Sequence, residues 1–168
     1  DDSMVIVSGS KRYKRQINGV VNVKWFGAKG DGVTNEGTAV NNAKNIAKAN
    51  NYKLYFPSGV YNFDSGSILL DDSIEITGDG KSTILKGENN VGALIFANAD
   101  NITISNLTLS TTATGYGHGI YIGKVDSILK NIKIKDRHVD RQTLRPLPDG
   151  AGAVHAFGDM AQRVHGLR

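Results

Sequence analysis

Residues 26–59, FGAKGDGVTNEGTAVNNAKNIAKANNYKLYFPSG, contain the signals that decide how this chain folds. A glycine-rich segment leads into a run of Ala, Asn and Lys, and a short apolar segment and a Pro-Ser-Gly turn follow. Within that run the apolar side chains share one helical face, which is formed by Val40, Ala43, Ile46 and Ala47. This spacing predicts a helix over residues 35–49, with small alanines that allow close approach to the edge of a sheet.

Both ends of this helix carry recognisable signals. Thr34 is the predicted N-cap, and Glu36 lies favourably in the first turn. The pair Asn50–Asn51 predicts the end of the helix, because Asn tolerates the left-handed conformation of a C-cap.

Short β-prone segments separated by turn residues follow the helix. They are predicted at residues 53–56, 59–63, 67–70, 73–77 and 83–86. Gly92–Phe96 then matches Gly119–Ile122 at an offset of 26, and Asn106–Leu109 matches Asn131–Ile134 at an offset of 25. A period of this size, with three short strands in each repeat, fits one coil of a β-solenoid. Leucine-rich repeats have a similar length, but their fixed leucine pattern is missing.

The repeat predicts an all-β fold, a right-handed parallel β-helix of about three or four coils with an N-terminal capping α-helix. Asn106 and Asn131 are expected at equivalent corners, where they stack as an asparagine ladder. The side chains expected to point inward and to stack coil on coil are Ile74, Ile76, Leu94, Phe96, Ile102, Ile104, Leu107, Leu109, Ile120, Ile122, Ile132 and Ile134.

Composition divides the chain into three parts: a lead-in over 1–24, the helix and coils over 25–136, and a distinct tail over 137–168. The tail contains no Ile, Asn or Lys and carries three of the four histidines. Its apolar spacing suggests a short helix over 151–164 that caps the last coil. The lead-in contains the basic cluster Lys11–Arg15, which fits a solvated linker or a contact with an anionic glycan or a partner subunit.

Bulk properties exclude several functional classes. The formal net charge is +4 with both signs mixed, which is no evidence for nucleic acid as a partner. The chain has no cysteine, and no apolar run approaches the roughly 18 residues of a membrane span. The glycine spacing after Phe26 is not that of a nucleotide-binding loop. Neither a cofactor nor a metal site is predicted.

Two segments carry a resemblance to a known family. Val21–Thr34 and Leu54–Tyr61, with the alanine-rich helix between them, resemble the N-terminal cap of pectate-lyase-3 and pectinase-like β-helix proteins. Trp25-Phe26-Gly27 and the lead-in Ile17–Val23 are most similar to bacteriophage tailspikes. The resemblance covers about residues 17–136. It implies a homotrimeric spike, on the virion or otherwise extracellular, that binds and usually cleaves the surface polysaccharide of a host bacterium.

Catalytic candidates are few. Gly117-His118-Gly119 is similar to a segment of polygalacturonases in which the His assists hydrolysis. That chemistry also needs a pair of carboxyl groups beside the scissile bond. Asp100 is the nearest acid and maps to a turn, so the catalytic set is incomplete, and a solvent-facing turn histidine is the structural alternative.

Aromatic side chains are the candidates for substrate binding. Tyr116, Tyr121 and Tyr61 are candidates for stacking on sugar rings, with packing against coil neighbours as the alternative.

The resulting functional hypothesis is the N-terminal portion of a tailspike that recognises and degrades O-antigen or capsule, without a complete active site in this chain. One alternative is a non-catalytic module that binds glycan or assembles the trimer. Another is a secreted pectinase-like enzyme, which Trp25 and the absence of cysteine disfavour.

Overall fold

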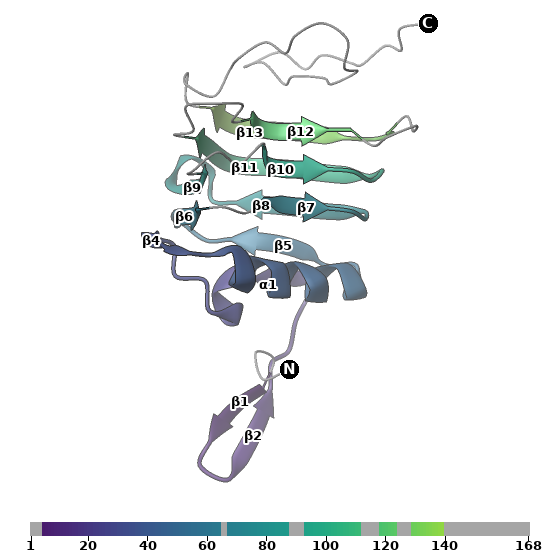
Figure 1. Ribbon diagram of the computed structural model, residues 1–168. Helices are drawn as coiled ribbons and strands as arrows, with labels where there is room; N and C mark the ends of the chain where they lie inside the picture. Colours follow the sequence, from purple (N-terminus) through teal and green to yellow (C-terminus); the bar gives the residue numbers. More distant parts are fainter. Residues whose placement is uncertain (1–4, 65–66, 88–92, 112–117, 124–128, 140–168) are drawn as a thin grey trace, which may run out of the picture.

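The computed structural model describes residues 5–64, 67–87, 93–111, 118–123 and 129–139 (Figure 1). Parallel strands wind about one axis and build three faces. The first face contains β3 (Val20–Asn22), β5 (Lys53–Phe56), β8 (Ile74–Gly78), the first half of β11 (Ile102–Thr111) and the start of β13 (Lys133–Val139). The second face contains β4 (Asp31–Asn35), β6 (Gly59–Phe63), β9 (Thr83–Gly87) and the second half of β11.

The third face is formed by β7 (Ile68–Leu70), β10 (Ala93–Ala97) and β12 (His118–Ile122), which are also parallel. The chain therefore visits the faces in a repeating order: β5, β6, β7, then β8, β9, β10, then β11 and β12, and β13 begins the next lap. This is the predicted parallel β-helix, or solenoid, and the predicted fold class is confirmed.

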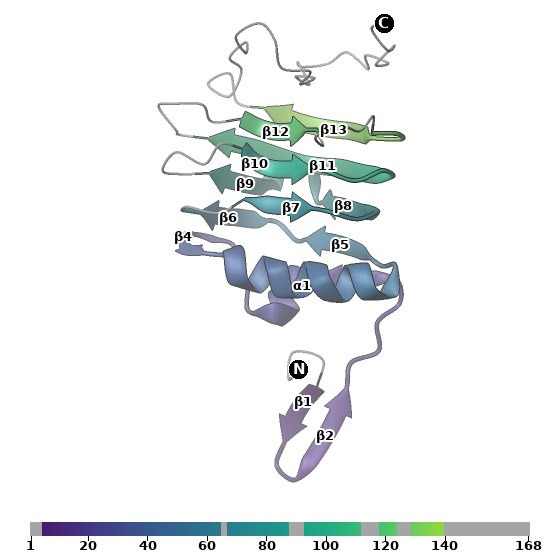
Figure 2. The ribbon, with the colours of Figure 1, turned by 45° about the vertical axis from the view of Figure 1, so that its right-hand side comes forward.

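Helix α1 (Gly37–Asn50) covers the first open edge of the solenoid, below β5 and β7 (Figure 2). Its face of Val40, Ala43 and Ala47 is buried. Lys44 on the same helix donates from Nζ to the carbonyl oxygen of Leu69 at 2.8 Å. The ammonium group thus donates a hydrogen bond to β7, which is the edge strand of its sheet among the described strands. The helix ends at Asn51, whose φ of 54° is the predicted left-handed cap.

The predicted N-cap at Thr34 is wrong. Thr34 belongs to β4, and its hydroxyl donates to Asp31 Oδ2 at 2.8 Å. Glu36 precedes the helix instead, and its carboxylate turns away from it. Glu36 is 1% exposed, and its Oε1 accepts hydrogen bonds from the backbone N–H groups of Lys29 and Gly30. The acid therefore shapes the glycine loop and does not cap the helix.

Inward side chains stack in columns along the axis. One column runs Leu54, Ile76, Ile104 and Ile134, as the strand registers show. Successive members lie 22, 28 and 30 residues apart, so the offset of 25 expected between Asn106–Leu109 and Asn131–Ile134 is wrong. The strand core is constant from lap to lap, whereas the turns between strands vary in length.

Register on the third face also corrects an expectation. Ile95 pairs with Ile120, and Phe96 pairs with Tyr121, an offset of 25 where 26 was expected. A slip of one residue exchanges the two faces of a strand. Ile95 and Ala97 are fully buried, whereas Phe96, expected to point inward, lies on the opposite face of β10.

The asparagine ladder joins a different pair from the one expected. Asn131 is equivalent to Asn101 and not to Asn106, because Thr103 pairs with Lys133 and Ile104 with Ile134. The helix expected at 151–164 lies outside the described residues.

A hairpin precedes the solenoid and projects beyond α1 (Figures 1 and 2). Its antiparallel strands are β1 (Val5–Ser8) and β2 (Lys11–Lys14). The basic cluster of the lead-in thus lies largely on a strand and not in a linker. Two short 3-10 helices, η2 (Val23–Phe26) and η3 (Gly80–Ser82), complete the elements. Among the described helices, none is long and apolar enough to cross a membrane.

Candidate functional site

The outward side of the third face carries a column of apolar side chains, formed by Leu69, Phe96 and Tyr121 on three successive laps. Leu69 is 42% exposed, and both rings are partly exposed. The ring centroids of Phe96 and Tyr121 lie 5.5 Å apart, with the planes tilted by 51°. We call these three residues the outward column. It presents two adjoining aromatic surfaces to solvent.

Gly123 makes room for the upper ring of this column. A Cβ atom at Gly123 would lie 3.0 Å from Cε1 and 3.2 Å from the hydroxyl oxygen of Tyr121. The phenol ring therefore lies beside the backbone of Gly123. A side chain at this position would push the ring away.

Polar groups adjoin the outward column where the strands end. The backbone N–H of Asn98 donates to Leu70 O at 2.8 Å, and that of Gly123 donates to Ala97 O at 3.2 Å. Asn98 thus lies one lap above Asp71, two residues along the strand from the column. The Oδ1 atom of Asn98 is buried and has no hydrogen-bond partner among the described residues.

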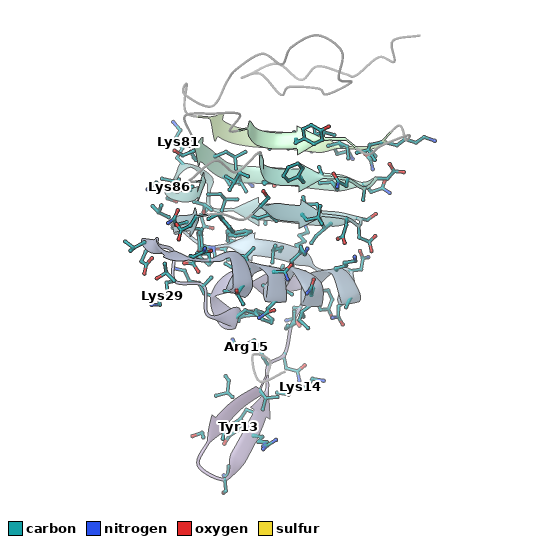
Figure 3. The ribbon with its side chains drawn as sticks, in the orientation of Figure 1. Tyr13, Lys14, Arg15, Lys29, Lys81 and Lys86 are labelled. Atoms are coloured by element: carbon teal, nitrogen blue, oxygen red, sulfur yellow. The ribbon has the colours of Figure 1, made fainter. Side chains whose placement is uncertain are left out.

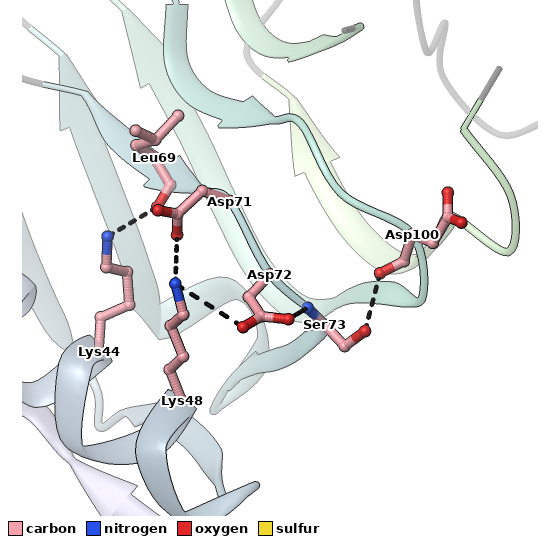
Figure 4. Close-up of polar contacts among 7 residues, drawn as sticks. All are labelled: Lys44, Lys48, Leu69, Asp71, Asp72, Ser73 and Asp100. Carbon is pink, nitrogen blue, oxygen red and sulfur yellow. Dashed lines mark hydrogen bonds and ion pairs between the residues drawn. The ribbon is translucent and has the colours of Figure 1, made fainter. Parts of the chain in front are cut away.

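Two lysines of α1 meet two aspartates at this corner (Figure 4). Lys48 Nζ lies 3.3 Å from Asp71 Oδ1 and 3.7 Å from Asp72 Oδ2. These three side chains, together with Lys44 and Leu70, line a shallow hollow. Lys44 and Lys48 both pair with protein groups, so the positive and negative charges at this corner balance one another.

Electrostatics hold the acids ionised both at this corner, where Asp71 lies, and beyond the other end of β8, where Asp79 lies. Partial burial raises the pKa of Asp71, but the hydrogen bond from Lys48 and the charges of Lys44 and Lys48 outweigh it and hold this pKa below its usual value. The hydrogen bond from the Tyr55 hydroxyl lowers the pKa of Asp79, with a further contribution from Ser58 N–H. A general acid for glycoside cleavage needs a raised pKa. Neither carboxyl group has this property.

The structure does not bring the two catalytic candidates together. His118 begins β12, where its backbone pairs with Ala93, and its side chain lies outside the described residues. Asp100 follows the other end of β10, at least about 13 Å away at the rise of a strand. The Oδ1 atom of Asp100 accepts from Lys130 N–H at 2.8 Å, and its carbonyl oxygen accepts from Ser73 Oγ at 3.2 Å. Asp100 links neighbouring laps at a corner (Figure 4).

Of the three tyrosines predicted to bind sugar, only Tyr121 is placed on an outward surface. Tyr116 lies outside the described residues. Tyr61 is fully buried, with its ring edge-on to Phe56 at 5.2 Å and its hydroxyl donating to Pro57 O at 2.7 Å. Burial raises the pKa of Tyr61 strongly. The expectation of an exposed ring at Tyr61 is therefore wrong.

Phe96 is the site residue that sequence reasoning missed. The signal was the alternation along Ile95, Phe96 and Ala97, which gives the correct face only once the offset of 25 is known. Among the described residues, no group of three or more His, Cys, Asp or Glu side chains is arranged to hold a metal ion.

The fold and this exposed face define a parallel β-helix of the pectate lyase-like class. The rhamnogalacturonase A/epimerase, pectate lyase-like family matches residues 20–143, and the chain belongs to this family. No curated protein matches the sequence significantly.

Several solved structures have the same fold. The A-modules of the mannuronan C-5 epimerases AlgE4 and AlgE6 of Azotobacter vinelandii are 23% and 25% identical, each with a TM-score of 0.59 over 70% of this chain and 37% of theirs. ORF18 of Geobacillus virus E2 is 22% identical, with a TM-score of 0.54 over 80% of this chain and 31% of that protein. The chain spans roughly a third of the length of these proteins.

Proposed function

We propose that this chain is the N-terminal part of a bacteriophage tailspike that recognises bacterial surface polysaccharide, O-antigen or capsule. Membership of a pectate lyase-like family supports a polysaccharide as the ligand. The fold shared with a protein of Geobacillus virus E2 supports a viral origin, and the A-modules are named for an enzyme that acts on mannuronan. The full-length parent is then a homotrimer on the virion.

The observation that carries the proposal is the pair of outward rings, Phe96 and Tyr121. Flat aromatic surfaces with a few polar groups beside them are typical of ligand sites, because the rings provide apolar contact and the polar groups fix orientation. The ion pair of Lys48 with Asp71 provides such groups at one end of the face.

Binding without cleavage is the activity proposed for this chain by itself. Each described acid with a shifted pKa has a pKa below its usual value. His118 begins β12 at one end of the third face, whereas Asp100 follows the other end of β10. Acid and base groups for hydrolysis or elimination then belong to other laps of the parent. His118 and Asp100 keep a proposed part only within such a larger set.

The test is titration of the chain with a panel of bacterial O-antigen and capsule oligosaccharides, with the products assayed for new reducing ends and for the absorbance of unsaturated uronate. The proposal expects binding that Phe96→Ala and Tyr121→Ala each weaken about tenfold, with no cleavage. Tyr55→Ala, an aromatic truncation on the first face, is the matched control. Equal losses in all three variants would contradict the assignment of the site, and new reducing ends would show that this chain is itself an enzyme.

A further inference from the structure

The β1–β2 hairpin carries a net positive charge, which Asp1 and Asp2, the two acids before it in the sequence, offset only in part. Residues 5–15 contain Lys11, Arg12, Lys14 and Arg15 and no Asp or Glu. All four residues of β2 are exposed, and none of the ion pairs among the described residues includes the hairpin. At ordinary ionic strength, charges a few ångströms apart on one small element reinforce one another.

An exposed aromatic ring stands among these cations. Tyr13 is 51% exposed and pairs across the hairpin with Ile6, which is 50% exposed. Side chains alternate along a strand, so Lys11 shares the face of Tyr13, whereas Arg12 and Lys14 lie on the other face. Figure 3 shows Tyr13 and Lys14 on the hairpin, away from the body of the solenoid.

Arg15 anchors the base of the hairpin. Its guanidinium carbon lies 4.5 Å from the ring centroid of Trp25, a cation–π contact with the 3-10 helix η2. The hairpin beyond this anchor has only two strands, and an isolated two-stranded hairpin is marginally stable in water. Val7 is 60% exposed as well. A partner that covers this element would therefore stabilise it.

We propose that the hairpin is a second glycan-binding element, specific for an anionic polysaccharide in which sugar rings carry carboxylate groups. Tyr13 contacts the apolar side of a sugar ring, and Lys11 on the same face pairs with a carboxylate beside it. Arg12 and Lys14 on the other face add to the positive field that attracts the polymer. The inference goes beyond the outward column, because it concerns a different surface and requires a negative charge on the ligand. The lysines beside that column, Lys44 and Lys48, are already engaged by Leu69 and Asp71.

Other occupants fit the hairpin less well. A second hairpin from another copy would bring like charges together, which is unfavourable. Single-stranded nucleic acid is bound by rows of aromatic side chains on which successive bases stack. The hairpin offers Tyr13 alone.

The test compares polymannuronate, neutral dextran of similar length and an oligothymidylate as probes of the whole chain. We expect polymannuronate to bind with an affinity that falls with salt, and dextran to show no salt-dependent binding. The triple variant Lys11→Gln/Arg12→Gln/Lys14→Gln should lose about tenfold or more in affinity for polymannuronate. Tyr13→Ala should weaken polymannuronate binding without weakening that of the oligothymidylate.

The matched control removes the same charge elsewhere. Lys81→Gln/Lys133→Gln/Lys135→Gln replaces three exposed lysines of the solenoid, of which Lys81 lies far from the hairpin (Figure 3). This control should retain its affinity within about twofold. Equal losses in both triple variants, or oligothymidylate bound as tightly as polymannuronate, would overturn the proposal.

Discussion

The side-chain amide of Asn131 donates to Oδ1 of Asn101 at 2.8 Å, and both residues have a left-handed φ of 57°. They occupy the same corner of neighbouring laps, 30 residues apart. The inward residues Ile104 and Ile134 follow three positions later and pair with each other. Asn51, with a φ of 54°, stands three positions before Leu54 in the same column. A left-handed asparagine therefore precedes three of the four members of this column by three positions, and Ser73 holds the equivalent place before Ile76.

Asn101→Ala should destabilise the solenoid by about 2 kcal/mol, because alanine is strained at positive φ and the hydrogen bond from Asn131 is lost. Asn101→Gly keeps the backbone conformation and should cost about 1 kcal/mol. Urea unfolding followed by circular dichroism measures both. A glycine variant less stable than the alanine variant would contradict this account of the corner.

Gly123→Ala should weaken glycan binding without removing any group that contacts the ligand. The added methyl group meets the Tyr121 ring at 3.0 Å and displaces it. Calorimetric titration should show a loss smaller than that of Tyr121→Ala, because the ring moves by only a few tenths of an ångström. In the Tyr121→Ala background the same substitution should have no further effect on affinity, since the two changes act on one ring. Additive losses would show that Gly123 acts independently of Tyr121.

Tyr61→Ala should cost about 4 kcal/mol of stability, because it leaves a cavity beside Phe56 in the core. Tyr61→Phe loses only the hydrogen bond to Pro57 O, about 1 kcal/mol, and should keep full glycan affinity. Unfolding and titration of the same two variants separate these effects. A loss of affinity in a fully folded Tyr61→Phe variant would assign this residue a binding role.

Stability should fall in acid partly through Asp79. Its pKa is lower in the folded chain than the usual 3.8, so the folded state binds this proton less tightly than the unfolded state. The contribution of Asp79 is therefore fully present above pH 3.8 and is lost as the pH falls through the folded-state pKa.

Thermal melting as a function of pH measures this loss. Asp79→Asn should flatten the acid limb of the profile, and Tyr55→Phe should flatten it partly, since the Tyr55 hydroxyl is the main cause of the lowered pKa. An unchanged acid limb in Asp79→Asn would exclude this group as a source of the pH dependence.

Local signals predicted much of the fold. The strands at 53–56 and 59–63 have the expected bounds, because Asn51 ends the helix before them and Pro57 and Gly59 separate them. Three of the four residues of the predicted helix face, Val40, Ala43 and Ala47, are buried, since the spacing is a property of one segment, whereas Ile46 is only partly buried. The prediction of Thr34 as the N-cap was wrong, because the Thr34 hydroxyl donates to the side chain of Asp31 instead.

Register is a relationship between laps and was harder to predict. The turns differ in length, so that the offsets of 25 and 26 read from sequence matches paired Asn131 with Asn106 and placed Phe96 inward. The candidate site depends directly on this register. Tyr121 was identified from its residue type, but its partner in the outward column required the pairing of β10 with β12.

The central claim is that the outward rings of Phe96 and Tyr121 bind bacterial polysaccharide. The most direct measurement is nuclear magnetic resonance of the chain in complex with the tightest-binding oligosaccharide of the panel, with intermolecular nuclear Overhauser effects recorded from the aromatic ring protons. The account predicts effects between sugar protons and the rings of both Phe96 and Tyr121. Effects confined to other aromatic residues, such as Tyr55 or Trp25, would contradict it.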